Sequence, residues 1–182
     1  MLPALQERYK RLNTAWHEYR RIIGNATPEQ QNFKPAPDKW CMLQVAQHVM
    51  ASEAGTLRFF KKYPPIKTGL AGQISGFIRS LTLTVALKLP LKFKAPKVPD
   101  LNPQTAIPWE QTEPEWVTIR AELDNYFNSF PPEKSGYIVF KHPVGGKFNI
   151  SQTLDFLLEH INHHLLQLQR IQQAEGYPAA GS

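Results

Sequence analysis

The chain has 182 residues, of which 42% are hydrophobic and 11% aromatic, so we expect one domain with a hydrophobic core and exclude a mostly disordered chain. Its single cysteine excludes an internal disulfide framework and a cysteine-rich zinc module. The formal net charge of +6 is unevenly distributed, because residues 54–99 hold nine basic and no acidic side chains. Such a basic segment can bind phosphates, an acidic partner or an anionic membrane. The alternative is that its lysines only keep the protein soluble.

Apolar side chains recurring every three or four residues predict four amphipathic helices. The predicted helices span Leu2–Ile23, residues 41–62, Glu113–Phe130 and Ser151–Glu175. Gly24 ends the first helix as a C-terminal cap, and Pro64 with Pro65 ends the second. Pro114 is expected in the first turn of the third helix, and Ser151 is expected as the N-cap of the fourth.

The segments between these helices lack a helical pattern. Residues 27–40 contain three prolines and predict a loop, whereas Tyr137–Phe140 predicts a short β-type run before a Pro/Gly turn. Residues 70–91 are apolar enough to suggest a membrane span, but Arg79 and several polar residues argue against one. We therefore predict a long, partly helical cross-over there, followed by an extended connector over residues 87–99.

These elements predict an all-α fold, a four-helix bundle of up-down-down-up or similar topology with the cross-over between helices two and three. Residues 1–175 are expected to form one domain, and residues 176–182 a frayed tail. The N-terminal run MLPALQERYKRLNTAW lacks the uninterrupted apolar stretch of a signal peptide, so we expect a cytoplasmic protein.

The strongest chemical motif is the run Glu159-His160-Ile161-Asn162-His163-His164 in the last helix. His160 and His164 are four residues apart, so their imidazoles project from one helix face and two nitrogens can reach one ion. Histidines on a helix are also common as solvent-facing polar groups, and this alternative stays open. His48, inside helix two beside the apolar residues Val45 and Val49, is a candidate third ligand.

Two groups of residues resemble the DinB/YfiT-like metalloenzyme family. The first is Asp38-Lys39-Trp40-Cys41 followed by Val45, His48 and Glu53, which resembles the family's second-helix signature. The second is His142-Pro143 and Gly146-Lys147 followed by a helix start and the spacing H-x-x-H-H-x-x-Q over residues 160–167. The resemblance spans most of the chain, although residues 64–112 match no motif of the family.

The resemblance implies a four-helix bundle that holds a divalent metal, zinc or nickel, through His48, His160 and His164. It also implies a transferase or isomerase reaction that uses a low-molecular-weight thiol such as bacillithiol or mycothiol. Three protein nitrogens leave one coordination position open, as in catalytic zinc sites, where a thiol or water would be acidified. Cys41 departs from the family's usual serine, which weakens the expected cap of helix two.

Further candidates have a structural and a functional interpretation. Cys41 is either a small core residue or a helix-terminal thiolate, and Trp40 either a plug between helices or a pocket wall. The carboxylates of Glu53 and Glu159 either orient ligand imidazoles or lie on a solvated face. Because it is rotated by about 100° from His164, His163 is expected outside the site, as a surface residue or a proton relay. His142 is expected in a turn.

Three hypotheses follow for the function. The first is a metal-dependent thiol S-transferase or hydrolase acting on a small molecule, and the second is a non-catalytic metal-binding or stress-response bundle. The third uses the basic stretch 58–97, with the apolar residues Ile74, Phe77, Ile78 and Leu81, for peripheral contact with an anionic membrane. Homodimerisation through the same stretch is an alternative, and the absence of a known motif argues against nucleic-acid binding.

Overall fold

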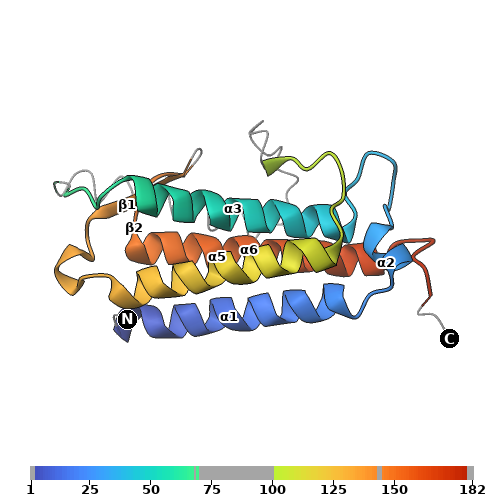
Figure 1. Cartoon of the computed structure of the whole chain (residues 1–182), viewed down its shortest axis with the longest axis horizontal. Coiled ribbons are helices and arrows are strands. Elements are labelled where there is room, and N and C mark those ends of the chain that lie inside the picture. Colours follow the sequence, from blue (N-terminus) through green and yellow to red (C-terminus); the bar gives the residue numbers. More distant parts are fainter. Residues whose placement is uncertain (1–2, 68, 70–100, 143–144, 180–182) are drawn as a thin grey trace.

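The computed structural model describes residues 3–67, 69, 101–142 and 145–179. Four long helices lie side by side in one bundle (Figure 1): α1 (Pro3–Gly24), α3 (Met42–Lys62), α5 (Trp109–Ser129) and α6 (Ile150–Gln172). Helices α1 and α6 run one way along the bundle, and α3 and α5 run the other way. The predicted all-α, up-down-down-up bundle is therefore confirmed, and α3 packs on both α5 and α6.

A small hairpin closes one end of the bundle, where α3 ends and α6 begins. Strands β1 (Ile138–His142) and β2 (Gly146–Asn149) pair antiparallel, and Ile66 adds an isolated bridge to Ile138. Gly146 has a φ of 84°, a conformation that side chains with a Cβ rarely adopt. The sequence predicted the first strand and the turn, but it did not predict β2.

The core lies along the common axis of the four long helices and extends into the hairpin. Its largest fully buried side chains include Trp116, Tyr19, Phe127, Phe148, Leu5, Leu12, Ile23, Met42 and Leu123. Phe148 of β2 and Phe156 of α6 have ring centroids 6.2 Å apart, so the hairpin shares the aromatic core of the bundle. This packing fixes the position of β1 and β2 against the first turns of α6.

Two predicted helix starts were wrong. Helix α5 begins at Trp109, so Pro114 lies inside the helix rather than in its first turn. The Pro108 carbonyl accepts the backbone N–H of Thr112 and its hydroxyl, which sets the earlier start. The N-cap of α6 is Asn149, not Ser151: Asn149 Oδ1 accepts from Gln152 N–H, and Gln152 Oε1 accepts from Asn149 N–H.

The segment predicted as a loop at 27–40 contains a one-turn helix, α2 (Pro28–Asn32). Thr27 is its N-cap and Gln30 completes a capping box, with Pro28 at the first helical position. Part of the C-terminal tail contacts this turn, because the Gln30 amide donates to the Pro178 carbonyl at 2.9 Å. The Tyr177 ring also packs edge-on against Phe33, with centroids 5.5 Å apart.

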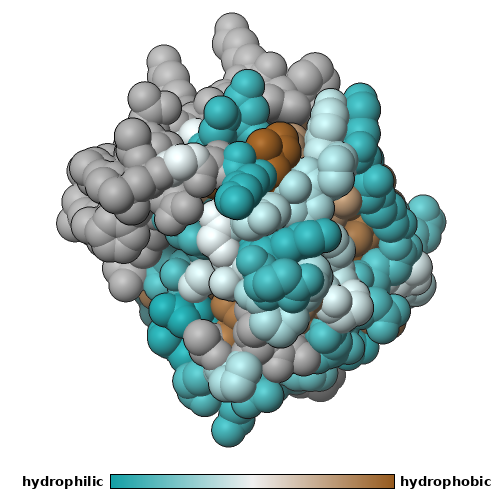
Figure 2. Space-filling view, turned by 90° about the vertical axis from the view of Figure 1, so that its left-hand side faces the viewer, coloured by the Kyte–Doolittle hydropathy of each residue, from teal (hydrophilic) through white to brown (hydrophobic). Residues whose placement is uncertain are grey.

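The predicted cross-over, the connector 87–99 and the apolar residues proposed for membrane docking lie outside the described residues. Within the described ranges, no helix has the length and apolarity needed to cross a bilayer. The surface at the hairpin end of the bundle is mostly hydrophilic where it is described, with small separate hydrophobic spots (Figure 2).

Candidate metal centre

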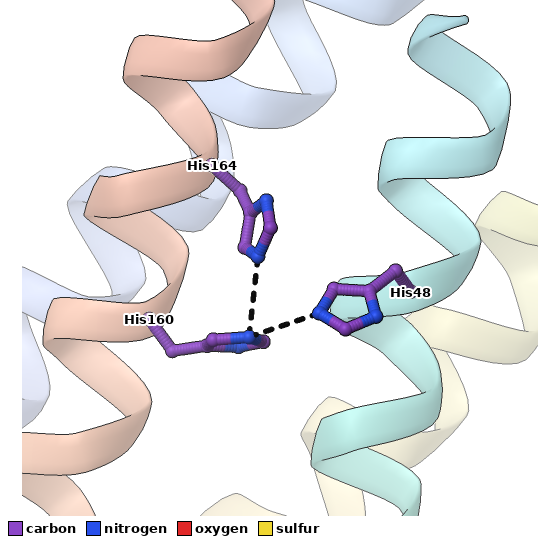
Figure 3. A group of neighbouring side chains, drawn as sticks. All are labelled: His48, His160 and His164. Atoms are coloured by element: carbon purple, nitrogen blue, oxygen red, sulfur yellow. Dashed lines mark hydrogen bonds between the residues drawn. The ribbon is translucent and has the colours of Figure 1, made fainter. Parts of the chain in front are cut away.

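Three histidines from two helices meet in the interior of the bundle. His48 lies in the second turn of α3, and His160 and His164 lie one turn apart in α6, which packs against α3 (Figure 3). Each side chain is buried, with exposed fractions of 7%, 8% and 7%. The structure thus brings together the three residues that the sequence singled out, and it leaves them facing one another rather than solvent.

The ring nitrogens of these residues, here called the three-histidine group, converge on one point. His160 Nε2 lies 3.2 Å from His48 Nε2 and 3.2 Å from His164 Nε2. One nitrogen from each ring lies within 4.8 Å of the other two. Ligand nitrogens at 2.0–2.1 Å from a tetrahedral zinc ion are about 3.3 Å apart. The observed separations therefore fit three ligands of one ion, and the group can hold a metal.

Hydrogen bonds on the far side of two rings fix which nitrogen carries the proton. His48 Nδ1 lies 2.6 Å from the Leu101 carbonyl oxygen, and His164 Nδ1 lies 2.8 Å from Gln167 Oε1. A backbone carbonyl can only accept, so His48 carries its proton on Nδ1 and its Nε2 presents a lone pair; with the Gln167 amide oxygen directed at Nδ1, His164 has the same tautomer. His160 Nε2 faces both lone pairs and can donate to only one of them. A cation at the centre would satisfy all three nitrogens.

Burial keeps these imidazoles neutral. It lowers the pKa of His48, and it lowers the pKa values of His160 and His164 well below the usual histidine range, with repulsion among the rings adding to the effect. Aromatic rings back the group, with Trp40 5.2 Å from the His48 ring and Phe156 stacked 5.4 Å from the His160 ring. Neutral imidazole is the form that binds divalent metals, so no proton has to be displaced from these ligands at pH 7.

A comparison with protein families matches residues 11–168 to the model of the DinB superfamily. The chain belongs to the DinB superfamily. The resemblance inferred from the sequence motifs is thereby confirmed, and membership together with the buried three-histidine group fits a metal-binding role. A search of curated proteins and a search of solved structures found no match to this DinB-superfamily chain.

Glu53 is the main correction within the DinB-superfamily bundle, because neither interpretation made from the sequence holds. Its side chain is 1% exposed, so it does not lie on a solvated face. Glu53 Oε2 accepts from Trp116 Nε1 at 2.8 Å and Glu53 Oε1 accepts from Arg120 Nη1 at 3.0 Å. Arg120 Nη2 also donates to Asn13. Glu53 thus belongs to a second buried polar cluster, the Glu53 network, of Glu53, Trp116, Arg120 and Asn13, and not to the histidines.

The other sequence candidates lie around the three-histidine group. Cys41 is 1% exposed in the core, which agrees with its structural interpretation, and Trp40 is half-buried against the His48 ring. His163 is half-buried, with its ring 5.1 Å from His164, and Glu159 is half-buried. His142 ends β1 rather than lying in a turn; its Nδ1 accepts from Gly145 N–H at 2.8 Å.

Two groups that bind histidines of the three-histidine group had no role assigned from the sequence. Gln167 follows His164 by three residues, so its position on the same helix face was a readable indication that its amide could reach the ring. The Leu101 carbonyl is a backbone group more than fifty residues from His48 along the chain. No side-chain pattern points to such a contact, and the structure is needed to find it.

Proposed function

We propose that this chain holds one divalent metal ion, zinc or nickel, through His48, His160 and His164, and uses it in a thiol-dependent transfer or a hydrolysis. The observation that carries the proposal is the convergence of three Nε2 atoms, with oxygen atoms of Leu101 and Gln167 at the opposite nitrogens of His48 and His164. No carboxylate completes the cluster among the described residues, so the donor set is neutral and imidazole only. That set suits zinc, nickel, copper and iron, and availability selects among them.

Three protein ligands favour a catalytic over a structural role. A structural zinc site is closed by four protein ligands, whereas three leave a position for a substrate. An ion held in this way acts as a Lewis acid and acidifies a thiol or a water molecule. The residues of the chain orient the three rings, keep them neutral and surround them with aromatic side chains, which keeps bulk water away from the ligands.

Elemental analysis of untagged protein tests the first half of the proposal. We expect about one zinc or nickel per chain in the wild type and none in the His160→Ala, His164→Ala double variant. His163→Ala is the matched control: it removes an adjacent histidine of the same helix that is outside the three-histidine group, and it should retain the metal. A metal-free wild type, purified without chelators, would contradict the proposal.

A screen of low-molecular-weight thiols with electrophilic small molecules tests the second half. The metal-loaded wild type should consume free thiol, or hydrolyse an ester or amide in its absence, and the double variant should do neither. Stoichiometric metal without either reaction would favour the alternative, a non-catalytic metal-binding bundle. In that case the ligand substitutions would mainly lower the stability of the metal-loaded protein.

A further inference from the structure

Three neighbouring polar side chains of α3 bind the backbone of one loop, residues 101–107. Gln44, Gln47 and His48 are spaced so that they share a helix face, and all are buried, with exposed fractions of 3%, 8% and 7%. Gln44 Nε2 donates to the carbonyls of Pro103 and Gln104 at 3.0 and 3.2 Å. Gln47 Oε1 accepts from Ile107 N–H at 3.3 Å. The loop is therefore attached to α3 at two further points, both of which follow its contact with His48 along the chain.

The amide of Gln44 can bind in one orientation only. Its oxygen accepts from the backbone N–H of Cys41 at 3.2 Å, and its nitrogen faces two carbonyl oxygens. Rotating the amide by 180° would place its NH2 group against the Cys41 N–H and its oxygen against the two carbonyl oxygens. The orientation of the amide is therefore fixed at both ends. Gln44 thus joins the start of α3 to the loop through three hydrogen bonds.

The same loop supplies the acceptor that determines the tautomer of His48. The Leu101 carbonyl lies 2.6 Å from Nδ1, and the alternative tautomer would direct an Nδ1 lone pair at the carbonyl oxygen. If the loop moved away, His48 would lose this restraint and its Nε2 could carry the proton. An Nε2–H cannot bind a metal, so the position of the loop controls whether His48 is ready as a ligand.

We propose that Gln44 and Gln47 are positioning residues for the metal centre: by holding the loop 101–107 on α3, they keep the Leu101 carbonyl on Nδ1 of His48 and its Nε2 lone pair directed at His160. This inference rests on the proposed function, because it concerns the ligand set proposed there. It assigns to two buried glutamines, neither of which touches the three-histidine group through its amide bonds, a share in metal affinity.

The test uses Gln44→Met and Gln47→Met, which keep side-chain length and remove the amide. Zinc affinity is measured by competition with a chromophoric chelator, and the ligand field is followed by the visible spectrum of the cobalt-loaded protein. Loss of partners that orient a ligand weakens metal binding 10- to 100-fold, and we expect about a tenfold loss for each variant. In the metal-free protein, two-bond ¹H–¹⁵N spectra should show His48 protonated on Nδ1 in the wild type and partly on Nε2 in the variants.

Gln152→Met is the matched control. Gln152 is the third residue of α6 and accepts from the N–H of its helix cap, as Gln44 does in α3, but it makes no contact with the loop. It should lower the denaturation midpoint in the way that loss of a capping bond does, and leave zinc affinity and the His48 tautomer unchanged. This control separates an effect on the ligand from a general loss of stability.

The outcomes separate the two proposals. Wild-type zinc affinity in both glutamine variants, an unchanged His48 tautomer, or an equal loss of affinity in Gln152→Met would overturn the positioning role while leaving the metal centre in place. A wild type that binds no zinc overturns the proposed function instead, and the tautomer spectra of the metal-free proteins then decide by themselves whether the glutamines hold His48. A variant that fails to fold is replaced by Gln44→Leu or Gln47→Leu in the same measurements.

Discussion

Helix α3 contributes to two buried polar clusters that are built on opposite principles. His48 and Glu53 are five residues apart, about 140° around the helix, so His48 faces α6 and Glu53 faces α5. In the Glu53 network a carboxylate meets two donors, and each of its oxygens has a partner. In the three-histidine group, the Nε2 atoms of His48 and His164 both face Nε2 of His160, which can donate to only one of them. The three histidines, Glu53, Trp116 and Arg120 are buried like the core around them, and Asn13 is half-buried.

The difference distinguishes a cluster of paired opposite charges from a cluster of neutral rings with too few protons. The Glu53 carboxylate and the Arg120 guanidinium pair as opposite charges, and their contacts join α1, α3 and α5, with Arg120 Nε alone lacking a partner in this cluster among the described residues. Three neutral imidazoles with too few protons are satisfied only by a further cation or proton. Burial of a polar side chain therefore does not by itself indicate a binding site. The indication comes from whether the donors and acceptors of the buried neighbours match one another.

Removing Glu53 should have the largest effect on stability. Glu53→Ala leaves the Arg120 guanidinium buried without its carboxylate, and the loss of one partner of a buried pair costs about 3–5 kcal/mol of unfolding free energy. Chemical denaturation of the metal-free protein measures this loss. Zinc affinity should stay close to the wild-type value, because Glu53 makes no contact with the histidines.

The double variant Glu53→Leu, Arg120→Met sharpens the same comparison. Replacing both charged groups by apolar ones of similar size removes the orphaned charge, so most of the lost stability should return. A double variant as unstable as Glu53→Ala would show that the two residues do not act as a pair. A large loss of zinc affinity in either variant would show that the two clusters are coupled, against the separation drawn above.

The helices and the common face of His160 and His164 could be predicted from the sequence because both depend on local spacing. Apolar periodicity places each long helix to within a few residues, and the four-residue separation of His160 and His164 fixes their common face whatever the rest of the fold does. His48 was a candidate from its place inside an apolar helix face and from the family motif, but its position opposite α6 depends on how the helices pack.

The failures share a physical cause, which is contact between residues far apart in the sequence. Glu53 was placed on a solvated face or beside the histidines because its partners, Trp116 and Arg120, lie on another helix. The loop at 101–107 has no side-chain pattern, and its role comes from backbone carbonyls. The capping boxes that begin at Thr27 and Asn149 are different, because they are local sequence patterns that could have been recognised. The prolines of residues 27–40 favoured a loop instead, and Ser151 was predicted as the N-cap in place of Asn149.

The buried neutral histidines, His142 among them, predict that the free energy of unfolding depends on pH. Burial lowers the pKa of His142, whose ring stacks on Phe148 at 5.8 Å, to about 4. An unfolded histidine has a pKa of about 6.5, so between these values the unfolded state binds a proton that the folded state does not. Its contribution is complete above about pH 6.5 and is lost as the pH falls to about 4, by up to about 1.4 kcal/mol per pH unit.

His142→Phe isolates this contribution, because the new ring can still stack on Phe148 and cannot be protonated. Denaturation of the metal-free wild type and the variant at several pH values from 7 to 4.5 should give a shallower decline for the variant, by up to about one proton. Burial also lowers the pKa values of His48, His160 and His164, so a decline remains in the variant. Identical slopes would contradict the burial of a neutral His142.

The smallest predicted effect concerns a hydroxyl beside the Glu53 network. Tyr19 packs edge-on against Trp116, with ring centroids 5.3 Å apart, and its buried hydroxyl has no hydrogen-bond partner among the described residues. Tyr19→Phe should therefore be neutral or stabilising by up to about 1 kcal/mol. Tyr9→Phe is the matched control, because the Tyr9 hydroxyl bonds to Asp124 and Asn13, and it should cost about 1 kcal/mol. If Tyr19→Phe destabilised the protein as much as Tyr9→Phe, the Tyr19 hydroxyl would contribute a stabilising hydrogen bond, against its lack of a partner in the structure.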